Sequence, residues 1–373
     1  MSAVRKLKIL HLTYDMRIGG TEQVIKNLVD NTDAMLFDSS VLCIESPLGP
    51  FATDLINTGI VVTAFSRSPG FDRKLIRLIR SYLKDNNIDI LHCHQYTPWV
   101  YGVLAAFMTA TKVIFTEHGR FYPDSSTWKR KLVNPWLHRI TNRTTAISEA
   151  TQHALAKYEN LPIADVQVIY NGISPLEIDE NIAKRLRNQL GIDEDTLCLG
   201  TVARFDPIKN HSMMLYAFRQ VLNHGIKAKL VIVGDGEMRS EINRIISEQK
   251  MEQDVILTGY QADARHYLAL MDIYLLSSLS EGTSMTLLEA MSISKPCVVT
   301  DAGGNPEIII DKLNGLVTPN DDADAFAEAI IRLADDEELR CGMAKESLSR
   351  YKNKFSATSM CNQFKKLYFE VSK

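Results

Sequence analysis

The stretch that decides the fold of this chain is Glu281-Gly282-Thr283-Ser284-Met285-Thr286-Leu287-Leu288-Glu289. It follows an apolar run, Ile273–Leu276, that predicts a buried β-strand. Thr283 and Ser284 are good N-cap residues, so a helix should begin there. A strand, a turn and a helix in this order are typical of α/β folds. The free backbone N–H groups at such a helix start can bind a phosphate.

The two carboxylates of this stretch lie on either side of the predicted phosphate site. Glu281 lies in the loop before the helix, and Glu289 lies more than one turn inside it. A sugar diphosphonucleoside needs donors for its diphosphate and acceptors for the hydroxyls at both of its ends. The alternative is an ordinary acidic loop followed by an exposed helical glutamate. The spacing of the two glutamates does not by itself separate these interpretations.

Strand-helix units continue towards the N-terminus. Short apolar runs predict strands at Leu7–Leu12, Val41–Cys43, Val61–Ala64, Ile90–His92, Val113–Thr116 and Thr145–Ile147. Amphipathic helical patterns lie between them, for example at Thr21–Val29 and Leu75–Leu83. Repeated units of this kind imply a parallel sheet that helices cover on both faces.

A second series of such units begins near Leu197. Its strands are predicted at Leu197–Val202, Leu230–Val233, Val255–Thr258, Ile273–Leu276, Val298–Thr300 and Leu316–Val317. Its helices are predicted at His211–Leu222, Glu237–Ser247, Ala262–Ala269, Ser284–Met291, Asn305–Ile310 and from Asp322 onwards. Between the series, Asn171-Gly172 followed by Pro175 marks a break. We therefore expect two doubly wound α/β domains, residues 1–172 and 173–356, with a ligand in the cleft where the carboxyl ends of their strands face each other.

Composition excludes several classes of protein. The 373 residues are 45% apolar and 23% charged, which is ordinary for a soluble globular protein, and the net charge of −3 argues against a nucleic-acid binder. Six scattered cysteines without a C-x-x-C pair predict free thiols in a reducing, cytoplasmic compartment. No apolar run reaches the roughly 18 residues of a membrane span, and the one after the basic N-terminus is too short for a signal peptide. We expect a soluble protein, or one attached to the cytoplasmic face of a membrane.

Positive charge is concentrated in the first domain. Residues 1–170 hold 19 Lys and Arg against 15 Asp and Glu. The basic residues cluster at Arg73–Lys84 and at Lys129–Lys131, the latter between Trp128 and Trp136. One interpretation is solvated helix faces, and the other is attraction to an anionic membrane surface or a phosphate-bearing acceptor.

Four segments that suggest other chemistry are set aside. Asp193-x-Asp195 and Asp322-x-Asp324 lie in polar turns or helix starts, where Asp caps the backbone, so we do not expect them to bind metal. In His92-Cys93-His94, strand alternation points Cys93 away from both histidines, and no further ligand set is apparent. Gly234-x-Gly236 lacks the third glycine of a dinucleotide fingerprint.

Further motifs give the chain a resemblance over nearly its whole length. In chain order, they are Gly19-Gly20-Thr21-Glu22, His118-Gly119, Ser148-Glu149, Tyr170-Asn171-Gly172-Ile173, Arg204-Phe205-Asp206-Pro207-Ile208-Lys209-Asn210, Gly234-Asp235-Gly236-Glu237, Gly303-Gly304-Asn305-Pro306-Glu307 and Gly315-Leu316-Val317. With the E-x7-E of Glu281 and Glu289, this series resembles the retaining glycosyltransferases of family 4. That family has the GT-B fold, in which two Rossmann-like domains face each other across a cleft and a final helix, here about residues 357–373, packs back on the first domain.

The resemblance also implies roles. The residues assigned to catalysis are Arg204, Lys209, Glu281 and His118. Those assigned to the donor are Gly19, Gly20, Gly234, Tyr260, Thr283, Ser284, Met285 and Glu289. The two cations would hold the diphosphate, Glu289 the ribose and Glu281 the donor sugar, while backbone amides at Thr283–Met285 would meet the sugar or phosphate.

Simpler alternatives remain for three of these residues or groups. The glycine pair would allow close approach of the backbone to the diphosphate, although a tight turn before a helix also needs glycine. His118 would lie near the donor sugar and the acceptor, although a single histidine is often structural. Tyr260 would lie against the base, although a core or rim aromatic is an alternative.

The implied function is transfer of a hexose or N-acetylhexosamine, with retention, from a nucleotide diphosphate sugar. UDP is favoured over GDP, and the acceptor would be a glycan or glycolipid in surface polysaccharide or lipopolysaccharide synthesis. No metal or other cofactor and no protein nucleophile is expected. The alternatives are a nucleotide-sugar 2-epimerase of the same fold and a scaffold subunit with a degenerate site.

Overall fold

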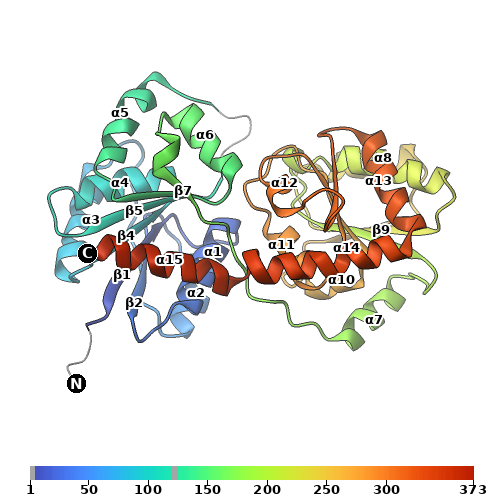
Figure 1. Cartoon of the computed structure of the whole chain (residues 1–373), viewed down its shortest axis with the longest axis horizontal. Helices are drawn as coiled ribbons and strands as arrows, with labels where there is room; N and C mark the ends of the chain where they lie inside the picture. Colours follow the sequence, from blue (N-terminus) through green and yellow to red (C-terminus); the bar gives the residue numbers. More distant parts are fainter. Residues whose placement is uncertain (1–4, 120–124) are drawn as a thin grey trace. The chain divides into compact units, whose positions relative to one another are not determined.

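The computed structural model describes residues 5–119 and 125–373, which form two compact units (Figure 1). Unit 1 comprises residues 1–174 and 357–373, and unit 2 comprises residues 175–356. Each unit is a parallel β-sheet with helices on both faces, so the predicted α/β class is confirmed. No helix in the described part of the chain is long and apolar enough to cross a membrane.

The sheet of unit 1 has seven parallel strands in the order β3-β2-β1-β4-β5-β6-β7. The strands are β1 Leu7–Thr13, β2 Phe37–Cys43, β3 Val62–Ala64, β4 Ile90–His94, β5 Lys112–Glu117, β6 Arg143–Ala146 and β7 Val166–Val168. All six predicted strands are present, and β7 was not predicted because the polar Gln167 interrupts its short apolar run. The strand order reverses between β1 and β4, which makes their carboxyl ends the topological switch point of unit 1.

Among the described residues of unit 1, seven α-helices surround this sheet (Figure 1). They are α1 Gly20–Asn31, α2 Pro50–Asn57, α3 Arg73–Asp85, α4 Tyr96–Ala106, α5 Trp128–Arg139, α6 Glu149–Glu159 and the C-terminal α15 Ala357–Ser372. One face of the sheet packs on α3 and α4, where the Trp99 and Phe115 rings stack at 4.4 Å. The other face packs on α1, α2 and α15. Residues at alternate strand positions therefore enter different layers.

The sheet of unit 2 has six parallel strands in the order β10-β9-β8-β11-β12-β13, so its switch point lies between β8 and β11. The strands are β8 Leu197–Val202, β9 Ala228–Val233, β10 Val255–Gly259, β11 Ile273–Leu276, β12 Cys297–Thr300 and β13 Gly315–Thr318. All six were predicted to within two residues at either end. Strands that are buried on both faces read as continuous apolar runs, which are the strongest signal of this kind.

The helices of unit 2 include several whose start is fixed by a side chain. They are α7 Glu180–Gln189, α8 His211–Asn223, α9 Arg239–Glu248, α10 Arg265–Leu270, α11 Met285–Ser292, α12 Asn305–Ile308, α13 Ala323–Asp335 and α14 Glu337–Arg350. Asp322 caps α13 at the backbone N–H of Ala325, and Ser284 caps α11. Both caps were predicted, because Ser and Asp favour this position.

Candidate active site

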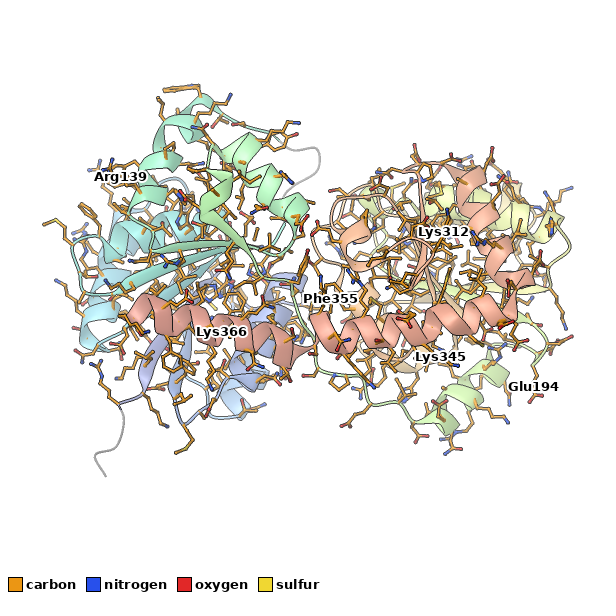
Figure 2. The ribbon with its side chains drawn as sticks, in the orientation of Figure 1. Arg139, Glu194, Lys312, Lys345, Phe355 and Lys366 are labelled. Atoms are coloured by element: carbon orange, nitrogen blue, oxygen red, sulfur yellow. The ribbon has the colours of Figure 1, made fainter. Side chains whose placement is uncertain are left out.

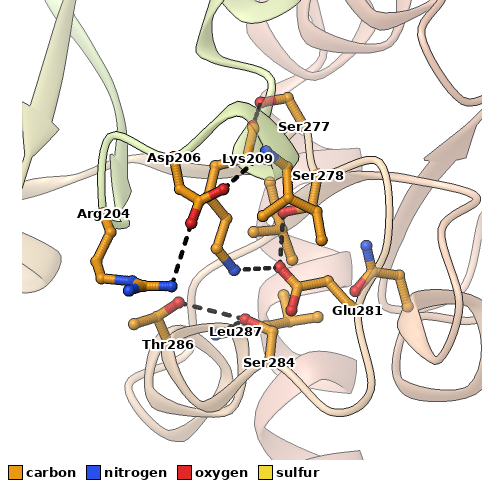
Figure 3. Close-up of polar contacts among 12 residues, drawn as sticks. Arg204, Asp206, Lys209, Ser277, Ser278, Glu281, Ser284, Thr286 and Leu287 are labelled. Atoms are coloured by element: carbon orange, nitrogen blue, oxygen red, sulfur yellow. Dashed lines mark hydrogen bonds and ion pairs between the residues drawn. The ribbon is translucent and has the colours of Figure 1, made fainter. Parts of the chain in front are cut away.

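A partly buried ion pair connects the loops that follow the two central strands of unit 2 (Figure 3). Lys209 ends the short 3-10 turn η2, Pro207–Lys209, after β8, and its Nζ lies 2.6 Å from Oε1 of Glu281 in the loop after β11. Ser278 Oγ donates to the same carboxylate oxygen at 2.6 Å. The other oxygen, Oε2, accepts no hydrogen bond from a described residue. The pair is therefore held in place with one carboxylate oxygen open to a ligand.

Backbone contacts hold these loops together. Leu279 N–H donates to Ile208 O at 2.7 Å, and Ser277 Oγ donates to Lys209 O at 2.8 Å. Residues 72 positions apart are thus brought together by hydrogen bonds at the switch point. The positions of Lys209 and Glu281 do not depend on their ion pair alone.

The backbone geometry at Gly303 explains why the motif Gly303-Gly304-Asn305-Pro306-Glu307 begins with glycine. Its φ is +56°, and a Cβ there would lie 2.0 Å from the carbonyl oxygen of Glu281. The next residue, Gly304, donates its N–H to that carbonyl at 2.9 Å. Glycine is required because the loop after β12 packs directly on the backbone of Glu281.

Arg204 is the exposed cation of this site. It follows β8, and 81% of its side chain is accessible. Its guanidinium lies 3.3 Å from Asp206, whose other oxygen accepts from Ile208 N–H at 3.0 Å. An exposed pair of this kind is weak, so Arg204 can turn to an anionic ligand at little cost.

The start of helix α11 lies after the Glu281 loop (Figure 3). Ser284 Oγ accepts from Leu287 N–H at 3.4 Å, and Tyr274 O–H donates to Thr286 Oγ1 at 2.7 Å. Thr283 and Ser284 are buried. The partial positive charge of a helix N-terminus therefore lies beside two cations, a setting suited to phosphate.

Glu289 lies one turn further along α11. Burial, with a smaller contribution from the charge of Asp263, raises the pKa of this carboxyl to about 7. No described residue hydrogen-bonds to its carboxylate. The side chain is partly buried, and hydroxyl groups of a ligand would give its carboxylate hydrogen-bond partners.

Gly234 and Tyr260, two other residues assigned to binding of the sugar donor, lie in different surroundings. Gly234 follows β9 with a φ of +148°, and a Cβ there would lie 2.0 Å from Ala203 O. Glycine is thus required by packing between neighbouring strand ends, whether or not a ligand binds. Tyr260 follows β10 and is 60% exposed, so its ring is open to contact.

In unit 1, the Gly19-Gly20 pair forms the start of α1. Gly19 is its N-cap, with an extended φ of −168°, and Gly20 is its first residue. A Cβ on Gly19 would lie 2.5 Å from Glu22 Oε2, so the Glu22 side chain folds over this glycine. Burial raises the pKa of Glu22, and nearby Asp15 adds to the effect.

His118 belongs to a chain of histidines that the sequence analysis did not find. It follows β5, and its Nε2 lies 2.8 Å from Nδ1 of His94, at the end of β4. His94 Nε2 lies in turn 3.0 Å from Nδ1 of His11 in β1. Burial lowers the pKa of His118 to about 3 and that of His11 to about 4, so both rings are neutral at pH 7. His118 Nδ1 is buried and has no hydrogen-bond partner among the described residues.

His11 also corrects the interpretation of His92-Cys93-His94. His11 pairs with His92 across β1 and β4, and ligand atoms of His11, His92 and His94 lie within 4.8 Å of one another. The view that no further ligand accompanies the motif was therefore wrong. Cys93 packs in the opposite, apolar layer, as predicted. In the described structure both nitrogens of His92 and of His94 are engaged in hydrogen bonds, which a metal would have to replace.

The acidic motifs have local partners. Asp193 and Asp195 both pair with Lys227, at 3.1 and 2.6 Å. Asp322 caps α13, and Asp324 accepts from Gln220 at 2.6 Å. These contacts give both motifs partners within the protein.

Two doubly wound parallel sheets, each with its own switch point, define the GT-B class of fold. The chain matches the family Glycosyltransferase Family 4 over residues 18–175 and the family Glycosyl transferases group 1 over residues 183–350. The chain therefore belongs to the group 1, family 4 glycosyltransferases and is a glycosyltransferase.

Relatives of known name align over most of the chain. One is the UDP-Gal:alpha-D-GlcNAc-diphosphoundecaprenol alpha-1,3-galactosyltransferase of Escherichia coli, 26% identical over 98% of this chain and 97% of its own. Another is the N-acetyl-alpha-D-glucosaminyl L-malate synthase of Bacillus anthracis, 28% identical over 81% of this chain and 80% of its own. The crystal structure of Anabaena HepE in complex with UDP shares the fold, with a TM-score of 0.87 at 21% identity over 98% of this chain and 100% of its own.

Proposed function

We propose that the protein transfers a hexose or N-acetylhexosamine from a UDP-sugar, with retention of configuration, to a lipid-linked or polysaccharide precursor. The observation that carries the proposal is the pair of cations, Arg204 and Lys209, after β8 in the unit that contains the start of α11. The names of the Escherichia coli relative and of the HepE complex support UDP over GDP. The malate acceptor in the name of the Bacillus anthracis relative marks the acceptor as the more variable partner.

The proposed roles in unit 2 follow from charge and hydrogen bonding. Arg204, Lys209 and the amides at Thr283–Met285 bind the diphosphate, because all of them present positive charge. Glu289 accepts hydrogen bonds from the ribose hydroxyls. Glu281 accepts one from the donor sugar through Oε2, while Lys209 and Ser278 hold its other oxygen.

The chemical step needs no protein nucleophile. The bond between the sugar C1 and the diphosphate oxygen breaks, the acceptor oxygen bonds to C1 on the same face, and the acceptor proton passes to the departing phosphate oxygen. Negative charge grows on the diphosphate, and cations already in place stabilise it more in the transition state than in the ground state. We propose that these cations make a metal unnecessary, and full activity in EDTA would support this.

The remaining donor roles carry over from the resemblance. Gly19 and Gly20 approach the diphosphate, Gly234 belongs to the donor pocket and Tyr260 contacts the base. His118 contacts the donor sugar or the acceptor. Its Nδ1 has no hydrogen-bond partner among the described residues, which supports this role because a neutral imidazole nitrogen can bond a hydroxyl.

Helix α5 supports a membrane-bound acceptor. Four of its large apolar side chains are exposed, with Trp128 at 69% and Leu132 at 70%. The other two are Val133 and Trp136, and the exposed Phe107 ring lies 5.9 Å from that of Trp136. Apolar side chains of this size together on a surface are typical of an interaction site.

The cations of α5 fit an anionic lipid surface. Lys129, Lys131 and Arg139 are exposed, and Arg139 lies at the C-terminal end of the helix (Figure 2). Arg130 is committed to the protein, because it pairs with Glu159 at 3.0 Å. We propose that this helix rests on the cytoplasmic face of a membrane, with its rings among the headgroups.

Vesicle sedimentation tests this surface. We expect binding to vesicles that contain anionic lipid and weak binding to neutral ones. Replacing Lys129 and Lys131 with Glu should abolish sedimentation, since each cation contributes about 1 kcal/mol at such a surface. Lys345→Glu in unit 2 is the matched control (Figure 2). Equal binding of both variants would contradict the proposal.

A thermal-shift screen with UDP- and GDP-sugars tests the function. We expect stabilisation by UDP and UDP-sugars, and loss of this shift in Lys209→Ala. Transfer assays with lipid-linked acceptors then follow release of UDP. Turnover without acceptor that yields an epimer would instead indicate an epimerase, and the absence of nucleotide binding would indicate a scaffold.

A further inference from the structure

Two separate hydrogen-bond networks lie on the face of the unit 1 sheet that α15 covers. The first contains His92, and the second contains His11, His94 and His118. The rings of His92 and His94 are in contact, with centroids 4.1 Å apart. The two networks differ in how many proton arrangements each allows.

In the first network, a single arrangement satisfies every hydrogen bond. If Thr145 Oγ1 donates to Phe115 O at 3.3 Å, then Thr116 donates its one hydroxyl proton to Thr145, 2.6 Å away. His92 Nε2 therefore donates to Thr116 at 2.7 Å, and His92 Nδ1 accepts from Tyr368 O–H at 2.8 Å. Every proton is assigned, because each hydroxyl carries one.

The second network has two arrangements. A neutral imidazole has one N–H and one acceptor nitrogen, so His94 donates to one neighbour and accepts from the other. If His94 donates to His118, then His118 carries its proton on Nδ1. If His94 donates to His11, then His118 carries its proton on Nε2, and its Nδ1 is an acceptor. Both arrangements satisfy the bonds of 3.0 and 2.8 Å.

We propose that His11 and His94 form a neutral tautomeric relay that positions His118 and lets its Nδ1 serve either as donor to, or as acceptor from, a sugar hydroxyl. Each switch passes one proton across each of the two hydrogen bonds. In one direction, His11 Nε2 takes a proton from water while His118 Nδ1 releases one to water or to the sugar hydroxyl; the reverse switch returns both protons, so no ring gains charge. The choice of a sugar hydroxyl as ligand rests on the proposed function.

Nitrogen NMR of the full chain with labelled histidine tests the relay without any assay of transfer. We expect a fixed Nε2–H form for His92 and exchange between both forms for His94 and His118. In His94→Phe, the exchange of His118 between its two tautomers should no longer be coupled to a neighbouring ring. His92→Phe, the matched control on the same strand, should leave this exchange unchanged. A charged His94 at pH 7, or a His118 signal insensitive to His94→Phe, would overturn the relay. The wild-type spectrum decides the question alone if a variant does not fold.

Kinetics give the second readout. His94→Phe should lower kcat about five- to tenfold with KM for the donor unchanged, as expected for loss of one orienting hydrogen bond. His94→Gln should retain more activity, because an amide can donate to one neighbour and accept from the other. If His94→Phe were as active as the wild type, or if His94→Gln were no more active than His94→Phe, the role of His94 would be packing and the relay would be refuted. If the wild type neither binds UDP nor transfers a sugar, the proposed function fails while the NMR result still decides the relay.

Discussion

The two units place different chemistry at the same topological position. At the switch point of unit 2, the Lys209–Glu281 pair and the exposed Arg204 are charged. At the switch point of unit 1, the strands carry His11 and His94, which burial keeps neutral. Fixed cations suit a diphosphate whose charge grows during reaction, whereas neutral imidazoles suit hydroxyls, which both donate and accept. One architecture can thus be specialised by the few side chains at its strand ends.

The largest effect should come from removing the central cation of unit 2. Lys209→Ala should lower kcat/KM for transfer about 1000-fold, because a preorganised charge at the departing diphosphate is lost. Steady-state release of UDP measures this loss. Lys312→Ala, at an exposed lysine of the same unit, is the control and should keep wild-type activity (Figure 2). If Lys209→Ala retained activity, the contrast between the units would lose its chemical basis.

A variant of Gly303 tests the packing that holds Glu281, the ion-pair partner of Lys209, in place. Gly303→Ala should destabilise the protein by about 2–3 kcal/mol, since its Cβ would overlap Glu281 O in a backbone region that disfavours Ala. Thermal melting measures this, and transfer should fall with it because Glu281 moves. Gly342→Ala on α14 is the matched control. Apart from the backbone of its own helix, no described residue has a heavy atom within 4 Å of the Cβ position, so this change should stabilise the helix by about 0.5–1 kcal/mol.

Glu289 is the carboxyl of the charged site whose pKa burial raises, and its pH dependence can be tested. Folding raises its pKa from 4.5 to about 7, so the folded protein keeps a proton that the unfolded chain loses between these values. The resulting stability is fully present below pH 4.5 and is lost as the pH rises through 7, by about 3 kcal/mol. Glu289→Gln should remove this dependence. The melting temperature of the variant should therefore increase relative to that of the wild type as the pH rises from 5 to 8. A constant difference would contradict the raised pKa.

Donor binding should show the opposite trend at this residue. Ribose hydroxyls bond best to the ionised carboxylate, so UDP affinity of the wild type should increase as the pH rises towards 7. Glu289→Gln should bind UDP more weakly and without this pH dependence. Calorimetric titration at several pH values measures both.

The smallest effect should come from the neutral network of unit 1. Tyr368→Phe removes the donor to His92 Nδ1 and leaves a buried acceptor unpaired, at a cost of about 1–2 kcal/mol. The melting temperature should fall, while UDP affinity and the His118 tautomers stay unchanged. A change in those tautomers would show that the two networks of unit 1 are coupled, contrary to the proton arrangement derived above.

The predictions from the sequence were accurate where the signal is local. Strands β8 and β11 appear at the predicted residues, because a strand buried on both faces is a continuous apolar run. The start of α11 was found because Ser284 caps it. Short β7 was missed, since its sequence, Val-Gln-Val, is not a continuous apolar run.

The site itself was predicted only in part. The resemblance named Lys209 and Glu281 as separate residues, but not as an ion pair, because a contact across 72 positions depends on which strands are neighbours. His11 went unnoticed for the same reason. Its position was visible as an apolar-strand histidine, but only the parallel register of β1 and β4 sets it opposite His92.

The sequence by itself determined the α/β class, most strand positions, the helix start at Ser284 and the family motifs. These follow from periodicity, capping and chain order, which act over a few neighbouring residues. Only the tertiary structure decided that Gly303 supports Glu281, that burial shifts the pKa of Glu289 and that three histidines form one chain. Distance and burial are properties of packing, and strand register brings together residues that the sequence keeps far apart.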